Sequence, residues 1–98
     1  MNADITLPRL AGTRAAADAL VDSADLRGAD EVTVYARAVA SAAQSFADEF
    51  VRRLDSRGVH HVRLVGSSPR LTDYLVASSK RLGSMTVSTS KVDDLIEH

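Results

Sequence analysis

Ser45 and Asp48 are the two residues whose types and spacing most clearly suggest chemistry in this chain. A serine followed three residues later by an acid is typical of a helix start, where the serine hydroxyl accepts a hydrogen bond from the backbone N–H of the acid. The helix dipole favours a negative group at that place by about 0.3–1 kcal/mol, so the serine marks a candidate functional position. The alternative is a helix cap with no further function, and the sequence leaves both interpretations open.

The helix expected after Ser45 has one apolar face, on which Phe46, Phe50 and Leu54 recur every four residues. An apolar alternating run at 32–35 precedes it along the chain. The sequence therefore predicts a strand–loop–helix corner with Ser45 at its tip, and we expect this corner to bind a partner. The residues predicted to contact that partner are Ser45, Phe46, Asp48 and Glu49.

The same helix carries charges at ion-pair spacing. Asp48 lies four residues before Arg52, a spacing that predicts a pair on one helix face. Glu49 and Arg53 have the same spacing. The arginines are scattered among thirteen acids, and the four aromatic residues offer little stacking surface. We therefore expect a solvated charged face and no nucleic-acid site.

A second candidate site is the turn 66–70, which reads Gly-Ser-Ser-Pro-Arg. A glycine turn, free N–H groups at a helix start and an arginine are the parts of an anion site. In an open parallel sheet, ligands lie beyond the carboxyl ends of the strands, where this turn is expected. An ordinary Ser-Pro helix cap explains the same residues, and no glycine-rich nucleotide motif is present. The candidate anion-binding residues are Gly66, Ser67, Ser68 and Arg70.

Few residues are suited to metal or enzyme chemistry. The chain has no cysteine, which excludes disulfides, thiolate nucleophiles and cysteine zinc sites. His60 and His61 are adjacent, so in a strand they point to opposite faces and cannot chelate one ion. Asp48 and Glu49 lie about 100° apart on a helix and do not converge on a substrate. We expect a protein that is not an enzyme and that holds no metal or cofactor.

The composition indicates one small globular domain. The chain has 98 residues, and its formal net charge of −1 provides no global field for nucleic acid or anionic lipid. No apolar run approaches the roughly 20 residues of a membrane span, and the first residues lack the pattern of a signal peptide. A cytoplasmic location is therefore expected. Ten arginines against two lysines, with fifteen alanines, suggest a GC-rich genome such as that of an actinobacterium or one of its phages.

Strand and helix patterns alternate along the chain. Thr13 and Ser68 are helix-cap candidates, Pro69 suits the first position of a helix, and Gly83 is a helix stop. The predicted strands are 5–7, 31–36, 59–65 and 85–88, and the predicted helices are 13–23, 45–57 and 69–82. The segment 37–43 is predicted to be a loop. The order βαβαβαβ predicts an α/β domain with a four-stranded, mainly parallel sheet packed by three helices.

Four short segments match one known family. They are T-R-x-x-A-x-x-L at 13–20, S-F-A-D-E-F at 45–50, V-R-L-V-G at 62–66 and R-L-G at 81–83. Together they resemble the STAS-like domain family of unknown function, which is similar to the STAS domains of anti-sigma-factor antagonists. The resemblance covers about residues 4–88 and implies one STAS-like domain over 1–98. Residues 89–98 form a C-terminal tail, in which a short helical turn at 92–98 or fraying is expected.

The resemblance implies a regulatory module that binds protein. In STAS relatives, a serine at the corresponding helix start is phosphorylated by a partner kinase of the GHKL ATPase type, and phosphorylation breaks the complex. Ser45 matches that position, although Gln44 stands where relatives usually carry aspartate. Asp48 and Glu49 would oppose a phosphoryl group, so phosphorylation is expected to change the docking surface and leave the fold intact. The alternative is a small phage- or actinobacterium-encoded protein that binds a host factor or self-associates, for instance as a homodimer, without a phosphoswitch.

Overall fold

The structure is a computed structural model that describes residues 2–83 and 85–90. In chain order its elements are β1 (Asn2–Thr6), β2 (Leu10–Ala11), α1 (Arg14–Ser23), β3 (Glu31–Tyr35), β4 (Ser41–Ala42), α2 (Gln44–Ser56), β5 (His61–Val65), α3 (Pro69–Leu82) and β6 (Thr86–Ser90). The long strands and the helices alternate as βαβαβαβ, so the predicted α/β class is confirmed. The short strands β2 and β4 are additions to the predicted order.

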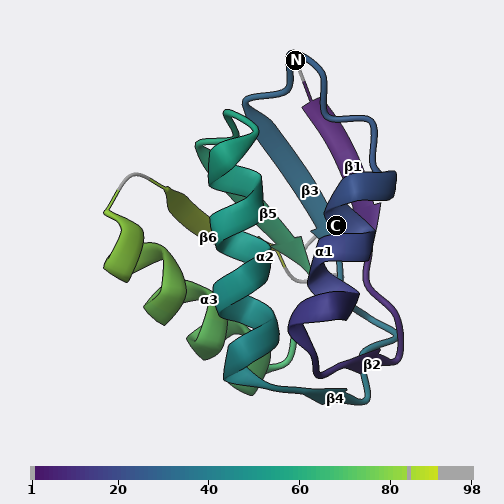
Figure 1. Cartoon of the computed structure of the whole chain (residues 1–98). Helices are drawn as coiled ribbons and strands as arrows, with labels where there is room; N and C mark the ends of the chain where they lie inside the picture. Colours follow the sequence, from purple (N-terminus) through teal and green to yellow (C-terminus); the bar gives the residue numbers. More distant parts are fainter. Residues whose placement is uncertain (1, 84, 91–98) are drawn as a thin grey trace, which may run out of the picture.

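The four long strands form one parallel sheet in the order β1-β3-β5-β6, including β6, whose direction the sequence left open. Each crossover steps to the next position in the same direction, and right-handed crossovers of that kind place every helix on one face. Figure 1 shows the three helices in front of the sheet, with α2 between α1 and α3. The carboxyl ends of the strands and the starts of the helices therefore share one edge, the lower one in Figure 1, which we call the carboxyl edge.

The core lies between the sheet and the helices. Val32 and Val34 on β3 are buried, whereas Thr33 between them is only half-buried, as the alternation of strand side chains requires. Phe46 and Phe50 on α2 are fully buried, with ring centroids 5.6 Å apart. Burial of each such side chain contributes about 1.5–3 kcal/mol, so the central helix is firmly fixed over the sheet.

The face of the sheet away from the helices is polar among the described residues. Arg63 on β5 pairs with Glu31 on β3 at 3.6 Å. The His61 ring nitrogens lie 2.6 Å from the Thr86 hydroxyl and 2.9 Å from the Ser88 hydroxyl. These contacts connect the edge strand β6 to β5 through side chains as well as through the backbone ladder.

Two helix starts and one helix end follow the sequence prediction. Thr13 caps α1, its hydroxyl accepting from the Ala16 N–H at 3.1 Å. Ser68 caps α3 and accepts from the Leu71 N–H at 3.2 Å. Gly83 ends α3 in the left-handed conformation, with φ of 77°. These predictions are confirmed because each depends on contacts within about one turn of the helix end, made by the side chain at Thr13 and Ser68 and by the backbone at Gly83.

The predicted loop 37–43 contains a strand. Within it β4 pairs in parallel with β2, so that Leu10 lies opposite Ser41 and Ala11 opposite Ala42. A strand of two residues has no periodicity to detect, which explains why the sequence did not indicate it. The helical turn or frayed tail predicted at 92–98 lies outside the described residues.

Candidate functional site

The start of α2 differs from its prediction. The N-cap is Ala43, and no side chain caps this helix. The Ala43 N–H donates to the Ala11 carbonyl at 3.1 Å, which holds Ala43 in an extended conformation beside β2 and lets the helix begin at Gln44. Ser45 is therefore already inside the helix, and the predicted capping pair of Ser45 and Asp48 is wrong.

Ser45 lies in the first turn of α2, at the carboxyl edge. Its side chain is half-buried, and its hydroxyl makes no hydrogen bond to any described residue. A hydroxyl used in a cap would be engaged with the helix backbone, whereas this one is not engaged with any described residue.

Two of the four predicted contact residues are not accessible. Phe46 has no exposed area and packs inside the core, and Glu49 is only 3% exposed. The apolar stripe of α2 turns toward the sheet, so side chains on that side cannot reach a partner. The prediction that Phe46 and Glu49 contact a partner directly is therefore wrong.

Asp48 is half-buried and serves to join α2 to α3. Its carboxylate accepts hydrogen bonds from Gln44 and from the Ser78 hydroxyl, and it pairs with Arg81 at 3.1 Å. Burial acts to raise the Asp48 pKa, but the Ser78 and Gln44 hydrogen bonds and the positive charge of Arg81 lower it overall. The predicted pair of Asp48 and Arg52 does not form.

Glu49 is the centre of a buried charge cluster. Arg52 contacts its carboxylate at 2.7 Å and Arg53 at 3.2 Å, which confirms the predicted pair of Glu49 and Arg53. Arg53 also reaches Asp18 on α1 at 2.8 Å. The Arg52 hydrogen bonds, supported by the Arg53 contact, lower the Glu49 pKa from 4.5 to about 2 even though burial acts in the opposite direction.

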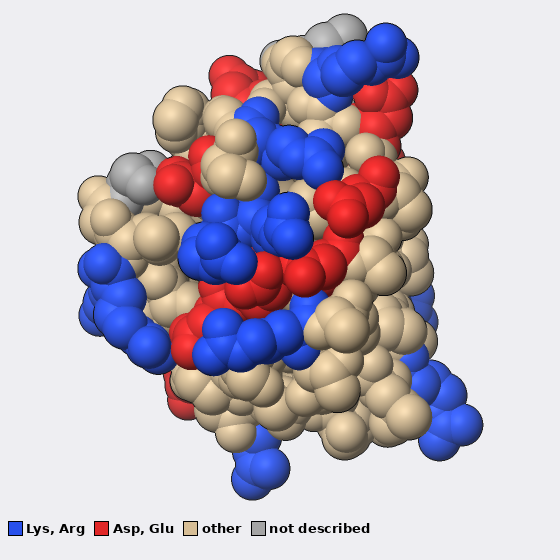
Figure 2. All heavy atoms as spheres, in the orientation of Figure 1, with Lys and Arg blue, Asp and Glu red and all other residues tan. Residues whose placement is uncertain are grey.

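These pairs belong to a band of alternating charge across the helices, which Figure 2 shows as neighbouring blue and red side chains. We call it the charged helix band. Its ion pairs run from α1 to α2 and from α2 to α3, with Arg57 on Asp22 at 2.9 Å as a further example. The band comprises Arg14, Asp18, Asp22, Asp48, Glu49, Arg52, Arg53, Arg57 and Arg81.

The turn 66–70 and the loop before α2 meet at the carboxyl edge. Gly66 has φ of 72°, and a Cβ built there would overlap Cγ of Arg37, so the arginine stem lies directly over the glycine. The Ser67 hydroxyl bonds to that of Thr72 at 2.8 Å, while Ser68 caps α3. Both hydroxyls thus support the helix start, as the cap interpretation requires. Beside them lies a hollow of about 310 Å³ lined by Val39, Ala40, Ser41, Ala42, Ser68 and Arg70.

The arginines at the carboxyl edge differ from those in the rest of the described structure in their ion pairing. Seven of the ten arginines form an ion pair with a described carboxylate, namely Arg14, Arg27, Arg52, Arg53, Arg57, Arg63 and Arg81. The three with no such pair are Arg9, Arg37 and Arg70, all exposed and all at this edge. Only Arg70 was a candidate from the sequence. Arg9 and Arg37 could have been identified from the sequence, because the segments 7–13, 36–43 and 66–70 contain no acidic residue.

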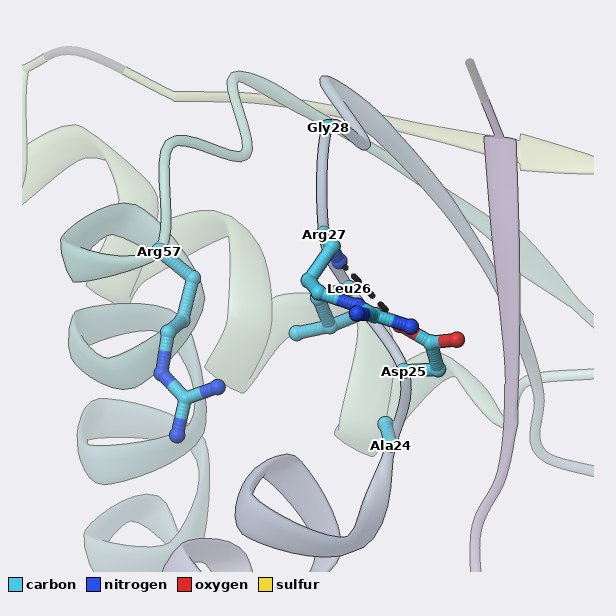
Figure 3. A pocket seen from close by; sticks show the side chains of 6 residues that line it. All are labelled: Ala24, Asp25, Leu26, Arg27, Gly28 and Arg57. Atoms are coloured by element: carbon cyan, nitrogen blue, oxygen red, sulfur yellow. Dashed lines mark hydrogen bonds and ion pairs between the residues drawn. The ribbon is translucent and has the colours of Figure 1, made fainter.

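A second hollow lies at the opposite edge, between the loop after α1 and the end of α2 (Figure 3). It measures about 390 Å³ and is lined by Ala24, Asp25, Leu26, Arg27, Gly28 and Arg57. Arg27 pairs with Asp25 at 3.3 Å, and Arg57 pairs with Asp22 at 2.9 Å. Its charges are already balanced by neighbours, so this hollow offers a charged ligand less than the carboxyl edge does.

Among residues 2–83 and 85–90, no group of three or more His, Cys, Asp or Glu side chains is placed to hold a metal ion. His60 is exposed just before β5, and His61 is half-buried within it. None of the described helices has the length and apolar character needed to cross a bilayer. Comparison with protein-family models, with curated proteins and with solved structures finds no match for this chain.

Proposed function

We propose that this chain is a non-enzymatic, STAS-like regulatory module that binds a partner protein in the cytoplasm through its carboxyl edge. The observation that carries the proposal is the Ser45 hydroxyl, which is half-buried, lies in the first turn of the central helix and has no hydrogen bond to any described residue. Residues positioned at strand ends and helix starts of a rigid scaffold are the usual place for binding function.

An exposed apolar side chain supports docking at the same edge. Leu10 on β2 is 67% exposed, the highest value among the large apolar side chains of the described residues. Its strand is paired with β4, which leads directly into α2 and Ser45. A large apolar side chain held in water on a fixed strand is a suitable anchor for a partner surface.

The surroundings of Ser45 favour control by phosphorylation. The first turn of α2 contains no acidic residue, and the N-terminal end of a helix favours a negative group. Asp48 and Glu49 were expected to oppose a phosphoryl group, but both carboxylates are neutralised by arginines. A phosphoryl group on Ser45 would change the docking surface without breaking these pairs, and the STAS resemblance names a GHKL-type ATPase as the kinase and partner.

Affinity capture from the native host tests the binding proposal, with two serine variants of the same helix. Ser45→Asp places a negative charge at the carboxyl edge, and Ser56→Asp places the same charge at the opposite end of α2, where Ser56 is exposed. We expect a protein that is captured by the wild type and by Ser56→Asp but not by Ser45→Asp. Identical captured proteins for all three would contradict the proposal.

A second candidate function is a binding module without a phosphoswitch. Gln44, the residue before Ser45, favours this second candidate. The Gln44 side-chain amide is held against α3 by the Tyr74 carbonyl at 3.1 Å and the Ser78 hydroxyl at 2.9 Å. A kinase would have to recognise Ser45 beside this fixed amide. Adding ATP to the captured complex separates the two candidates: release from the wild type but not from Ser45→Ala indicates a switch, and no release from either indicates a constitutive binder.

A further inference from the structure

The three arginines without a described carboxylate partner are brought to one surface by contacts between their loops. The Arg9 carbonyl accepts from the Ala40 N–H at 2.8 Å, which ties the loop after β1 to the loop before α2. Arg37 lies over Gly66, which ties that loop to the turn after β5. Arg70 completes the set by lining the hollow beside Ser41 and Ala42.

The segments that carry these arginines supply no compensating negative charge, and the nearest acid along the chain is Asp73, three residues after Arg70. The segments 7–13, 36–43 and 66–70 contain no acidic residue, and neither do the first turns of α1, α2 and α3. Figure 2 shows mainly uncharged atoms at the lower end of the molecule, with separate basic side chains projecting from it. The edge is therefore positive although the chain as a whole has a net charge of −1.

These features point to an acidic protein segment as the ligand of the edge. Three guanidiniums favour carboxylates or phosphates, because arginine presents a planar fork of N–H donors to such groups. Leu10, 67% exposed beside them, favours a ligand that also carries aliphatic side chains. Nucleic acid fits less well, since the segments 7–13, 36–43 and 66–70 provide no aromatic side chain on which a base could stack.

We propose that the carboxyl edge binds an acidic peptide segment of a partner protein, with its carboxylates on Arg9, Arg37 and Arg70 and an aliphatic side chain against Leu10. The inference rests on the proposed function and adds the chemistry of the partner. The edge is prepared for this ligand, because Gly66 leaves the space in which the Arg37 stem lies and no carboxylate of residues 2–83 and 85–90 pairs with the three arginines.

Fluorescence anisotropy with a labelled peptide EELDELDEE tests the inference on the full chain. The first control probe is QQLQQLQQQ, and the second is a twelve-nucleotide oligothymidylate. The test variant is Arg9→Gln/Arg37→Gln/Arg70→Gln. The matched variant is Arg27→Gln/Arg63→Gln/Lys80→Gln, which removes the same number of positive charges from exposed residues elsewhere.

We expect the acidic peptide to bind the wild type and the glutamine peptide to bind at least about tenfold more weakly. The test variant should lower affinity about tenfold, the matched variant less than about twofold, and Leu10→Ser about threefold. Binding should weaken as salt is raised, because the contacts are exposed ion pairs. Circular dichroism melts check that the variants are folded, which is expected since the test variant breaks no ion pair with a described residue.

Four outcomes would overturn the inference. Equal loss of affinity in the test and matched variants would mean a nonspecific charge effect, and tighter binding of the oligothymidylate would indicate a nucleic-acid surface. Peptide binding that appears only after Asp93→Asn/Asp94→Asn/Glu97→Gln would mean that the acidic segment 91–98 of this chain occupies the edge. If the host partner is still lost with Ser45→Asp but retained by the arginine variant, the proposed function stands and the acidic-ligand inference fails.

Discussion

The charged helix band and the carboxyl edge use arginine in opposite ways. In the band, guanidiniums reach carboxylates on neighbouring turns and neighbouring helices, as Arg53 does with both Glu49 and Asp18 at 3.2 and 2.8 Å. At the edge, Arg9, Arg37 and Arg70 form no ion pair with a described residue. Arginines that pair within the fold and arginines with no described carboxylate partner are thus separated on one small domain.

This contrast gives the carboxyl edge a functional interpretation that composition alone does not. A chain with thirteen acids and twelve basic residues could have paired every arginine. The band achieves pairing around the buried Glu49, where an unpaired charge would be costly. The edge lies in loops and helix first turns, where unpaired charge costs little because water screens it, and this is compatible with the contact to another molecule proposed above.

The largest effect is expected in the band, from Glu49→Gln. Removing the buried carboxylate leaves Arg52 and Arg53 without their shared partner, and we expect a loss of about 3 kcal/mol in the free energy of unfolding at pH 7. Urea denaturation followed by circular dichroism measures it. Glu31→Gln is the control, because its pair with Arg63 at 3.6 Å is exposed and is expected to contribute less than about 1 kcal/mol. A Glu49→Gln protein as stable as the control would contradict the account of the band.

The same variant has a defined pH dependence. The folded pKa of Glu49, about 2, lies below its unfolded value of 4.5, so the stabilisation is fully present above pH 4.5 and is lost as the pH falls through 2. The stability difference between wild type and Glu49→Gln should therefore be constant from pH 7 to 5 and shrink between pH 4.5 and 2. A difference that is the same at pH 3 and pH 6 would show that the cluster does not hold this carboxylate ionised.

A smaller effect is expected at the edge, from Gly66→Ala. The substitution places a Cβ at φ of 72° and against the Arg37 stem, which we expect to cost about 1–2 kcal/mol and to displace Arg37 from the turn. Gly12→Ala is the matched control, because it has no positive φ and no atom within 4 Å of a built Cβ. Thermal unfolding compares the two, and equal melting temperatures would show that Arg37 is not held over Gly66.

The helix starts at the carboxyl edge give the next smaller effects. Thr13→Ala and Ser68→Ala each remove a hydroxyl that caps a helix and should cost about 1 kcal/mol. Ser45→Ala removes a hydroxyl with no hydrogen bond to a described residue and should change stability by less than about 0.5 kcal/mol. Chemical denaturation of the three single variants measures this order. An equal loss in the free energy of unfolding for Ser45→Ala and Thr13→Ala would mean that Ser45 caps α2, contrary to the structure.

The smallest change in stability is expected for Arg9→Gln/Arg37→Gln/Arg70→Gln. No described carboxylate loses a partner, so each substitution should alter the free energy of unfolding by less than about 0.5 kcal/mol. Arg53→Gln serves as the contrast, since its guanidinium contacts two carboxylates of the band. Differential scanning calorimetry should give the triple variant a higher melting temperature than Arg53→Gln. The reverse order would contradict the distinction between the charged helix band and the carboxyl edge.

The sequence predicted the fold because alternating and helical apolar patterns recur along the chain and are separated by helix-cap and turn residues. Val32 and Val34 on a strand, and Phe46 and Phe50 on a helix, are buried as their spacing indicates. The caps at Thr13 and Ser68 were predictable for the same reason, since both ends of each contact lie within one turn. Features formed by residues close together in the chain could therefore be predicted from the sequence.

The features that the sequence did not predict are those made by residues far apart in the chain. The Ala43 bond to Ala11 moves the start of α2 and joins segments that no pattern connects. The pair of Arg57 with Asp22 spans two helices and 35 positions, so spacing rules for one helix cannot indicate it. The lack of acids around the edge arginines is visible in the sequence, but their lack of a described carboxylate partner becomes clear only after the other arginines have been paired in three dimensions.

The central claim is that the carboxyl edge is where this protein meets its partner. The most direct measurement is an NMR titration of the isotope-labelled full chain with the host protein whose capture depends on Ser45. The account predicts that the largest amide shift changes fall on residues 9–13, 37–45 and 66–70. Shift changes centred on the charged helix band, on the hollow around Arg27 and Arg57 or on the open face of the sheet would contradict it.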